Sequence, residues 1–140
     1  MPKITHRLIL FLYLCNIILD YLYIYSCCAE KVVSNCLLAG YGKTAGEAID
    51  DFYVSYKELK VSDGNTVPDI DVTLKFDVGS LFNYYGFLNI EGIARLSGIK
   101  ASVLRQYASG VRTPNERSLN MLAEGLRRAS DEIRNVRLRA

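Results

Sequence analysis

The sequence predicts an α+β protein in which a unit of strands and one helix precedes an all-helical module. Apolar and polar residues alternate from Ile70 to Phe76, which is typical of a half-buried strand. Thr44 and Glu47 have the spacing of a capping box at the start of a helix. Residues 89–112 carry glycine and apolar positions at the spacing of two short packed helices.

Charge divides the 140-residue chain in the same way, although the net charge is only +2. Residues 30–88 contain five Lys or Arg and nine Asp or Glu, whereas residues 89–140 contain ten and five. A basic module behind an acidic one is suited to contact with phosphates. We therefore expect three segments: an atypical apolar segment over 1–20, an α/β unit over 21–77 and a helical module over 78–140.

The α/β unit is predicted from local signals in chain order. An apolar run over 37–42 ends in glycines and predicts a strand that enters a turn. A helix follows from Ala45 to Lys60, and then a turn at 63–65. Its apolar face comprises Ala48, Ile49, Phe52, Tyr56 and Leu59. After the strand at 70–76, Asp77 is expected to cap a helix that reaches Gly86.

The N-terminal segment leaves three alternatives, because residues 8–29 are apolar apart from Asn16, Asp20 and Ser26. A transmembrane helix needs about 20 such residues, but Asp20 within it would cost about 2.5 to 3.5 kcal/mol. A secreted or lipidated protein would need a shorter apolar region and a small-residue cleavage site. In the third alternative, which we favour, the segment is cytosolic. Tyrosine and aliphatic residues alternate over 21–25, as they would in a strand. Residues 8–19 are then an atypical first element, an extension, or the product of a wrongly assigned start site or a frameshift.

Residues 89–112 have the spacing of a helix-turn-helix. Ala94 provides the small side chain needed where the first helix passes under the second, and Gly98 follows at the turn, where φ is positive. The apolar anchors are Ile93, Ile99, Leu104 and Tyr107. The alternative is a plain helical hairpin that binds nothing, and the basic charge of this module favours DNA binding.

The second helix of this motif is expected to run from Lys100 to Ser109 and to enter the major groove. Arg can bind guanine O6 and N7 together, Gln can pair with adenine and Ala can contact a thymine methyl group. Arg105 and Gln106 are therefore the candidates for direct base readout, with a solvated charge or a phosphate contact as the alternative for Arg105. The predicted DNA-binding residues are Lys100, Ala101, Ser102, Arg105, Gln106, Arg112 and Arg117. Of these, Lys100, Arg112 and Arg117 are assigned to phosphates, and Arg95 and Ser97 are secondary candidates.

A third helix is predicted over about 115–134. Its apolar residues, expected to close the core, are Leu119, Leu122, Ala123, Leu126, Ala129 and Ile133. Its arginines are interpreted chiefly as a solvated face.

Catalytic chemistry has little support in the sequence. His6 is the only histidine, and Cys15, Cys27, Cys28 and Cys36 lack metal-ligand spacing. Reduced thiols are expected. The acidic residues at 50, 51, 69 and 71 are interpreted as solvated carboxylates rather than as a metal-dependent nuclease centre. We expect a non-enzyme with no metal and no cofactor.

The chain resembles the HicB antitoxins of HicAB toxin–antitoxin systems over about 22–138. The resemblance depends on residues 40–44, Gly-Tyr-Gly-Lys-Thr, followed by Glu47-Ala48 and Asp51-Phe52, and on a C-terminal helix-turn-helix of the Cro type. The long apolar start departs from the family, whose members usually open directly into a strand. The resemblance implies a degenerate RNase H-like α/β domain that masks a small RNA-cleaving toxin, and a repressor-type domain that binds double-stranded operator DNA.

The resemblance also implies a cytoplasmic autoregulator that acts as a homodimer or higher homo-oligomer. Ser102, Arg105 and Gln106 take the DNA-contacting role by this analogy, whereas no toxin-contacting residue is carried over. The alternative function is a solitary transcriptional regulator without a toxin, tethered to a membrane by residues 8–29 in one version. A metal-dependent nuclease is the third option.

Overall fold

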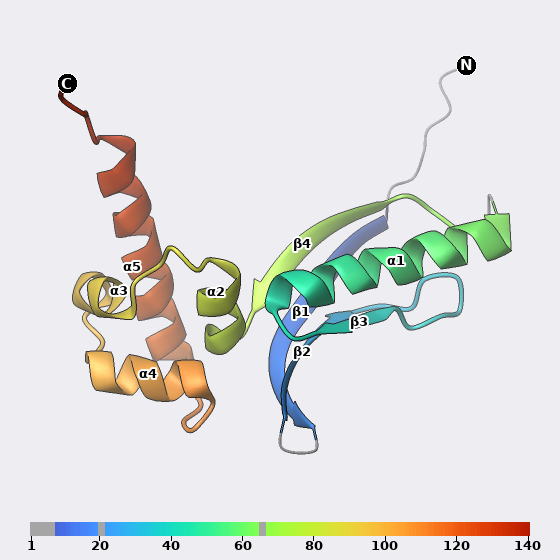
Figure 1. The fold of residues 1–140 in the computed structure, drawn as a ribbon, viewed down its shortest axis with the longest axis horizontal. Helices are drawn as coiled ribbons and strands as arrows, with labels where there is room; N and C mark the ends of the chain where they lie inside the picture. Colours follow the sequence, from blue (N-terminus) through green and yellow to red (C-terminus); the bar gives the residue numbers. More distant parts are fainter. Residues whose placement is uncertain (1–7, 20–21, 65–66) are drawn as a thin grey trace. The chain divides into compact units, whose positions relative to one another are not determined.

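The computed structural model describes residues 8–19, 22–64 and 67–140. It divides into two compact units, Met1–Tyr84 (unit 1) and Tyr85–Ala140 (unit 2). Unit 1 contains a four-stranded sheet with helices, and the secondary structure described in unit 2 is helical (Figure 1). The α+β class predicted from the sequence is confirmed at this level.

The sheet of unit 1 contains β1 (Leu8–Leu19), β2 (Leu22–Ala29), β3 (Ala39–Gly42) and β4 (Ile70–Phe76) in the order β3-β2-β1-β4. β2 is antiparallel to both β1 and β3, whereas β4 is parallel to β1. A parallel pair needs a crossover connection. Helix α1 (Ala45–Asp63), between β3 and β4, provides it and lies along one face of the sheet (Figure 1).

Helix α1 begins with the capping box that the sequence predicts. The Thr44 side chain accepts a hydrogen bond from the Glu47 N–H at 3.1 Å, and the Glu47 carboxylate accepts from the Thr44 N–H at 3.3 Å. All five residues of the expected apolar face are buried against the sheet: Ala48, Ile49, Phe52, Tyr56 and Leu59. Their partners include Leu10, Leu12, Leu14 and Cys27, so the core of unit 1 lies between α1 and the sheet.

Two glycines of β3 let α1 pack directly onto the strand. A Cβ atom at Gly40 would lie 2.2 Å from the backbone N of Phe52, and one at Gly42 would lie 2.4 Å from the Cβ of Glu47. Any side chain at either position would push the helix off the sheet. The glycines that end the apolar run are therefore required for the packing of α1 on β3.

The structure corrects the prediction for the apolar N-terminal segment. Its described part, residues 8–19, is strand β1, which lies between β2 and β4 and belongs to unit 1 rather than to a separate segment. β1 carries apolar residues on both faces, with Leu10, Leu12 and Leu14 buried in the core and Phe11 and Tyr13 on the more exposed face, so its sequence lacks clear alternation. Residues 22–25 of the strand expected over 21–25 belong to β2, and Tyr21 lies outside the described residues. Within the described ranges, no helix is long and apolar enough to cross a membrane.

The boundary expected between residues 77 and 78 lies instead at 84/85. Helix α2 (Val78–Tyr84), which ends two residues before Gly86, packs on β1, β4 and α1 and is therefore part of unit 1. Asp77 caps it as predicted, because its Oδ1 atom accepts a hydrogen bond from the Ser80 N–H at 2.7 Å. The second carboxylate oxygen accepts from the Asn16 N–H at 2.9 Å, which joins the start of α2 to β1.

Unit 2 contains α3 (Ile90–Ser97), α4 (Ala101–Ser109) and α5 (Glu116–Arg134). Its buried apolar residues are Ile93, Ala94, Ile99, Leu104, Tyr107 and Leu122. The apolar face predicted for α5 is only partly correct: Leu119 and Ile133 are 45% and 64% exposed, and Ala123 is exposed. α5 buries only one side of this face, because Leu122 and Gly125 are its buried residues.

Candidate nucleic-acid interface

Helices α3 and α4 lie where the sequence predicts the two helices of a helix-turn-helix. The Asn89 side chain caps α3 by accepting a hydrogen bond from the Gly92 N–H at 3.0 Å. α3 ends at Gly98, whose φ of 75° and ψ of 9° are left-handed and whose N–H donates to the Ala94 carbonyl at 3.0 Å. The glycine predicted at the turn therefore has the positive φ that selects glycine.

The packing of α3 against α5 depends on a small-residue contact that the sequence reasoning missed. A Cβ atom at Gly125 would lie 2.7 Å from the Cβ and 2.9 Å from the Cα of Ser97. Ser97 was a secondary DNA-contact candidate, but it is buried, and its hydroxyl donates to the Ala94 carbonyl at 3.1 Å. That assignment is wrong. A glycine inside the otherwise regular α5 was the available signal of a close approach.

The outward residues of α4 are those predicted from the sequence. Ser102, Arg105 and Gln106 are exposed and Ala101 is partly exposed, whereas Leu104 and Tyr107 are buried. The Tyr107 hydroxyl lies 3.2 Å from the Ser118 Oγ atom, which ties the buried side of α4 to α5. The exposed side of α4 therefore presents a short polar row on a supported helix.

Arg105 is the only charged residue of α4, and it is not a free cation in this structure. Its guanidinium forms an ion pair with the carboxylate of Glu91 on α3. Both side chains remain largely exposed, at 54% for Arg105 and 63% for Glu91. The sequence placed Arg105 on the correct face but gave no indication of this partner, which is fourteen residues earlier in the chain.

The three residues assigned to phosphates are all exposed. Lys100 is the N-cap of α4 and makes no side-chain capping bond, so the first amides of α4 lack the side-chain cap that α3 and α5 have. Arg112 follows α4, and its guanidinium carbon lies 5.9 Å from the centre of the Tyr107 ring. Arg117, in the first turn of α5, lines an open groove together with Glu116 and Asn120. Uncapped amides and basic side chains are groups that bind anions.

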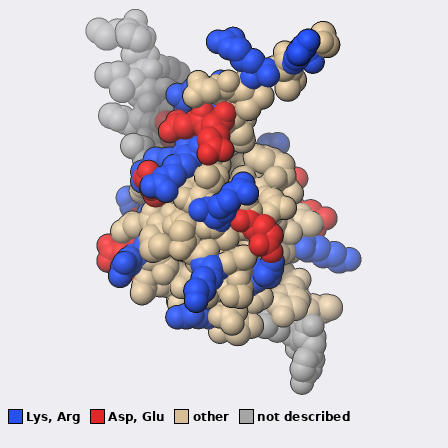
Figure 2. Space-filling view, turned by 90° about the vertical axis from the view of Figure 1, so that its left-hand side faces the viewer, with Lys and Arg blue, Asp and Glu red and all other residues tan. Residues whose placement is uncertain are grey.

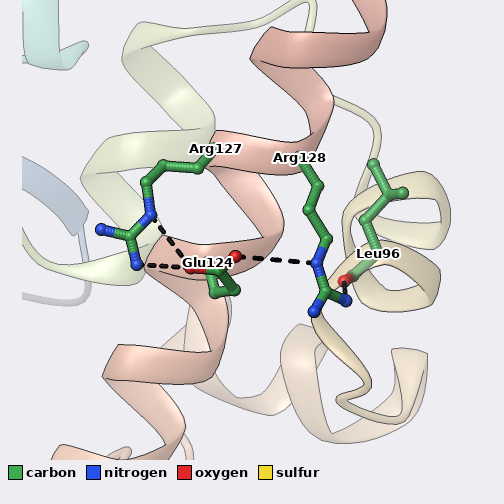
Figure 3. A network of polar contacts seen from close by, with 4 residues as sticks. All are labelled: Leu96, Glu124, Arg127 and Arg128. Atoms are coloured by element: carbon green, nitrogen blue, oxygen red, sulfur yellow. Dashed lines mark hydrogen bonds and ion pairs between the residues drawn. The ribbon is translucent and has the colours of Figure 1, made fainter.

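Two of the α5 arginines form hydrogen bonds and ion pairs within unit 2. Arg127 donates to Glu124 from Nε at 3.0 Å and from Nη2 at 2.6 Å. Arg128 contacts the same carboxylate and donates from Nη1 to the Leu96 carbonyl at 3.1 Å, near the C-terminal end of α3 (Figure 3). A cation at a helix C-terminus is favourable. Arg128 thus connects α5 to α3, whereas Arg127 forms its pair within α5, and these contacts add a structural role to the solvated face that we expected.

Basic side chains are spread over the face of the molecule shown in Figure 2, with fewer acidic ones between them. Two of the acidic residues considered for metal-dependent cleavage have other contacts in unit 1: Asp51 accepts from the Tyr41 N–H at 2.9 Å, and Asp69 pairs with Lys60. Among the residues that the structure describes, no group of three or more His, Cys, Asp or Glu is arranged to hold a metal ion.

Comparison with known proteins adds no relative of this chain: no family model, no curated protein and no solved structure matches it.

Proposed function

We propose that this protein is a DNA-binding autoregulator of the HicB-like antitoxin type. Unit 2 binds double-stranded operator DNA as a repressor-type helix-turn-helix domain, with α4 in the major groove. The observation that carries this proposal is the pair of helices joined at Gly98, whose second member exposes Ser102, Arg105 and Gln106 together. These residue types form specific contacts with base edges.

The surrounding charges support the same assignment. Lys100 precedes α4 and Arg112 follows it, both are exposed, and unit 2 as a whole is basic. Phosphate contacts position a protein on DNA and base contacts specify the sequence. The proposed assignment therefore gives Lys100, Arg112 and Arg117 the positioning role, and Ser102, Arg105 and Gln106 the reading role.

The proposed role of unit 1 is to mask a small RNA-cleaving toxin, without catalysis and in the cytoplasm. Its support is the resemblance at residues 40–52 together with the strand order β3-β2-β1-β4 and the α1 crossover, which suit a degenerate RNase H-like domain. A repressor of this type reads two half-sites as a dimer. We therefore propose that the chain acts as a homodimer or a higher homo-oligomer.

The test is a crosslinked pull-down with the full-length tagged protein in its own cells, with DNA and proteins identified in the same sample. We expect a discrete palindromic site near its own gene and a small co-purifying protein. The site without the small protein would support the solitary regulator instead. Recovery with membranes and without any enriched DNA would overturn the proposal.

A further inference from the structure

Strand β4 forms one end of the sheet, so one of its edges has no neighbouring strand among the described residues. Its hydrogen bonds to β1 begin with the Leu8 N–H donating to the Asp69 carbonyl at 2.8 Å and end with the Asp77 N–H donating to the Leu14 carbonyl at 2.9 Å. The residues that bond to a neighbouring parallel strand alternate along the chain. The odd-numbered residues of β4 therefore face β1, and the backbone groups of the even-numbered residues 70–76 point to the open edge.

The two faces of β4 are also unequal. Asp71, Thr73 and Lys75 are exposed on the face away from α1. The apolar residues on the α1 side are only partly buried: Ile70, Val72, Leu74 and Phe76. α1 packs chiefly against β3 and β2 and leaves this end of the sheet half covered. An open edge beside a half-buried apolar row is a surface to which another strand can be added.

The sequence of β4 is complementary to itself in one antiparallel register. When two copies pair about Thr73, all seven residues of the strand overlap. Asp71 then lies opposite Lys75 of the second copy, and Lys75 lies opposite its Asp71. Charges on an edge strand usually prevent pairing, but here each charge meets its opposite, which stabilises a cross-strand pair.

The backbone agrees with this register. Pairing about Thr73 places even-numbered residues opposite even-numbered ones, so Val72 meets Leu74 of the second copy, and Ile70 meets its Phe76. These are the residues whose N–H and C=O groups point to the open edge, and directly opposed residues of this kind exchange two hydrogen bonds in an antiparallel ladder. The apolar rows of both copies then lie on one face, which is the α1 face.

We propose that unit 1 dimerises through β4, joining two four-stranded sheets into one continuous sheet across a two-fold axis at Thr73. The inference deepens the proposed function, since it rests on the chain acting as a homo-oligomer, but it does not require DNA binding. An isologous interface of this kind uses the same surface on both copies. It would bring two DNA-binding units into one particle before any operator is bound.

The first test is a cysteine crosslink in the full-length chain, with the exposed Cys36 replaced by Ser. The axis pairs Thr73 with Thr73 of the second copy as a non-hydrogen-bonded pair, in which Cβ atoms lie about 4.5 to 5.5 Å apart. That spacing is close to what a disulfide needs. We expect Thr73→Cys to give a covalent dimer under mild oxidation. Tyr41→Cys, on the opposite edge strand β3 and 55% exposed, is the matched control and should stay unlinked.

The second test is a charge swap followed by analytical ultracentrifugation without DNA. Asp71→Lys places like charges opposite each other twice, so we expect the dimer dissociation constant to rise roughly tenfold, because like charges directly opposite each other destabilise a strand pair. The double variant Asp71→Lys/Lys75→Asp restores complementarity and should recover most of the affinity. Denaturant unfolding of each variant checks that the fold survives the loss of the Lys75 contact with the Phe11 ring, at 4.2 Å.

A wild-type chain that stays monomeric over the whole accessible concentration range would overturn the inference. A dimer whose dissociation constant is the same in both charge variants and in which Thr73→Cys forms no disulfide would also overturn the inference. Such a result would place the interface elsewhere. Neither result bears on DNA binding by unit 2, which is measured separately. Failure of the proposed function and failure of this inference are therefore distinguishable.

Discussion

Arg105 of α4 and Glu91 of α3 form an ion pair on the exposed surface of unit 2. Exposed pairs of this kind contribute about 0.2 to 1 kcal/mol, so Arg105 can exchange this carboxylate for a guanine edge or a phosphate at little cost. Glu91 lies in the first turn of α3. The pair gives the proposed reading residue a defined position in the free protein, and it places one negative charge beside the proposed DNA surface.

Replacing Arg105 with Ala should lower affinity for the operator by about 1 to 3 kcal/mol and leave affinity for unrelated DNA nearly unchanged, because a base contact is lost and a phosphate contact is not. Fluorescence anisotropy with both DNAs at several salt concentrations measures this. Arg112→Ala is the control: it should weaken binding to both DNAs and reduce the salt dependence. Equal weakening of both DNAs by Arg105→Ala would assign Arg105 to a phosphate.

Replacing Glu91 with Gln should raise affinity for the operator by roughly 1.4- to fivefold, which corresponds to the 0.2 to 1 kcal/mol of an exposed ion pair. The reason is that Arg105 is released from its ion pair with Glu91 and becomes available for the operator contact. Because this effect passes through Arg105, it should largely disappear in the Arg105→Ala background, which a double-mutant cycle measures. The same increase in both backgrounds would mean that Glu91 acts only through its charge.

Replacing Gly125 with Ala should destabilise unit 2. The new Cβ atom would lie within 3 Å of the Ser97 backbone, and overpacking of this kind costs about 1 to 3 kcal/mol, against a gain of about 1 kcal/mol in helix propensity. Hydrogen exchange of the α3 and α5 amides in the full chain reports the change. Gly92→Ala is the matched control, since its Cβ atom would meet no atom closer than 3.9 Å. Unchanged exchange in Gly125→Ala would show that α5 shifts freely.

The stability of unit 1 should fall as the pH rises from about 9 towards 12. Burial, with a smaller contribution from Cys28, raises the pKa of the Cys27 thiol from 9.0 to about 12. Above pH 9 the thiol ionises in the unfolded chain but stays protonated in the folded one, which costs up to about 1.4 kcal/mol per pH unit. Urea unfolding across this range should show a shallower decline for Cys27→Ala than for the wild type. Parallel declines would assign the pH dependence to other groups.

Local elements could be predicted from the sequence because their signals act within a few residues. The capping box at Thr44 and Glu47, the left-handed Gly98 and the alternation from Ile70 to Phe76 all lie where the sequence indicates. Each depends on the backbone geometry of one turn or on the period of one element. The outward direction of Arg105 and Gln106 followed in the same way, from the period of a single helix.

Local sequence signals are not sufficient to predict strand β1. Its apolar run suits a membrane helix as well as a strand, because both faces of β1 carry apolar residues and the sequence therefore does not alternate. Its position between β2 and β4 depends on residues 70–76, about sixty positions away. The assignment of α2 to unit 1 also required contacts with distant strands.

The sequence by itself determined the α+β class, the apolar face of α1, the turn at Gly98 and the residues that α4 exposes. Only the tertiary structure decided that Glu91 pairs with Arg105, that Ser97 is buried against Gly125 and that β4 lies at one end of the described sheet. Periodicity and capping act between neighbours along the chain, so they are visible in one stretch of sequence. Side-chain partners and sheet edges depend on which distant segments meet, and the pattern of any single segment does not contain that information.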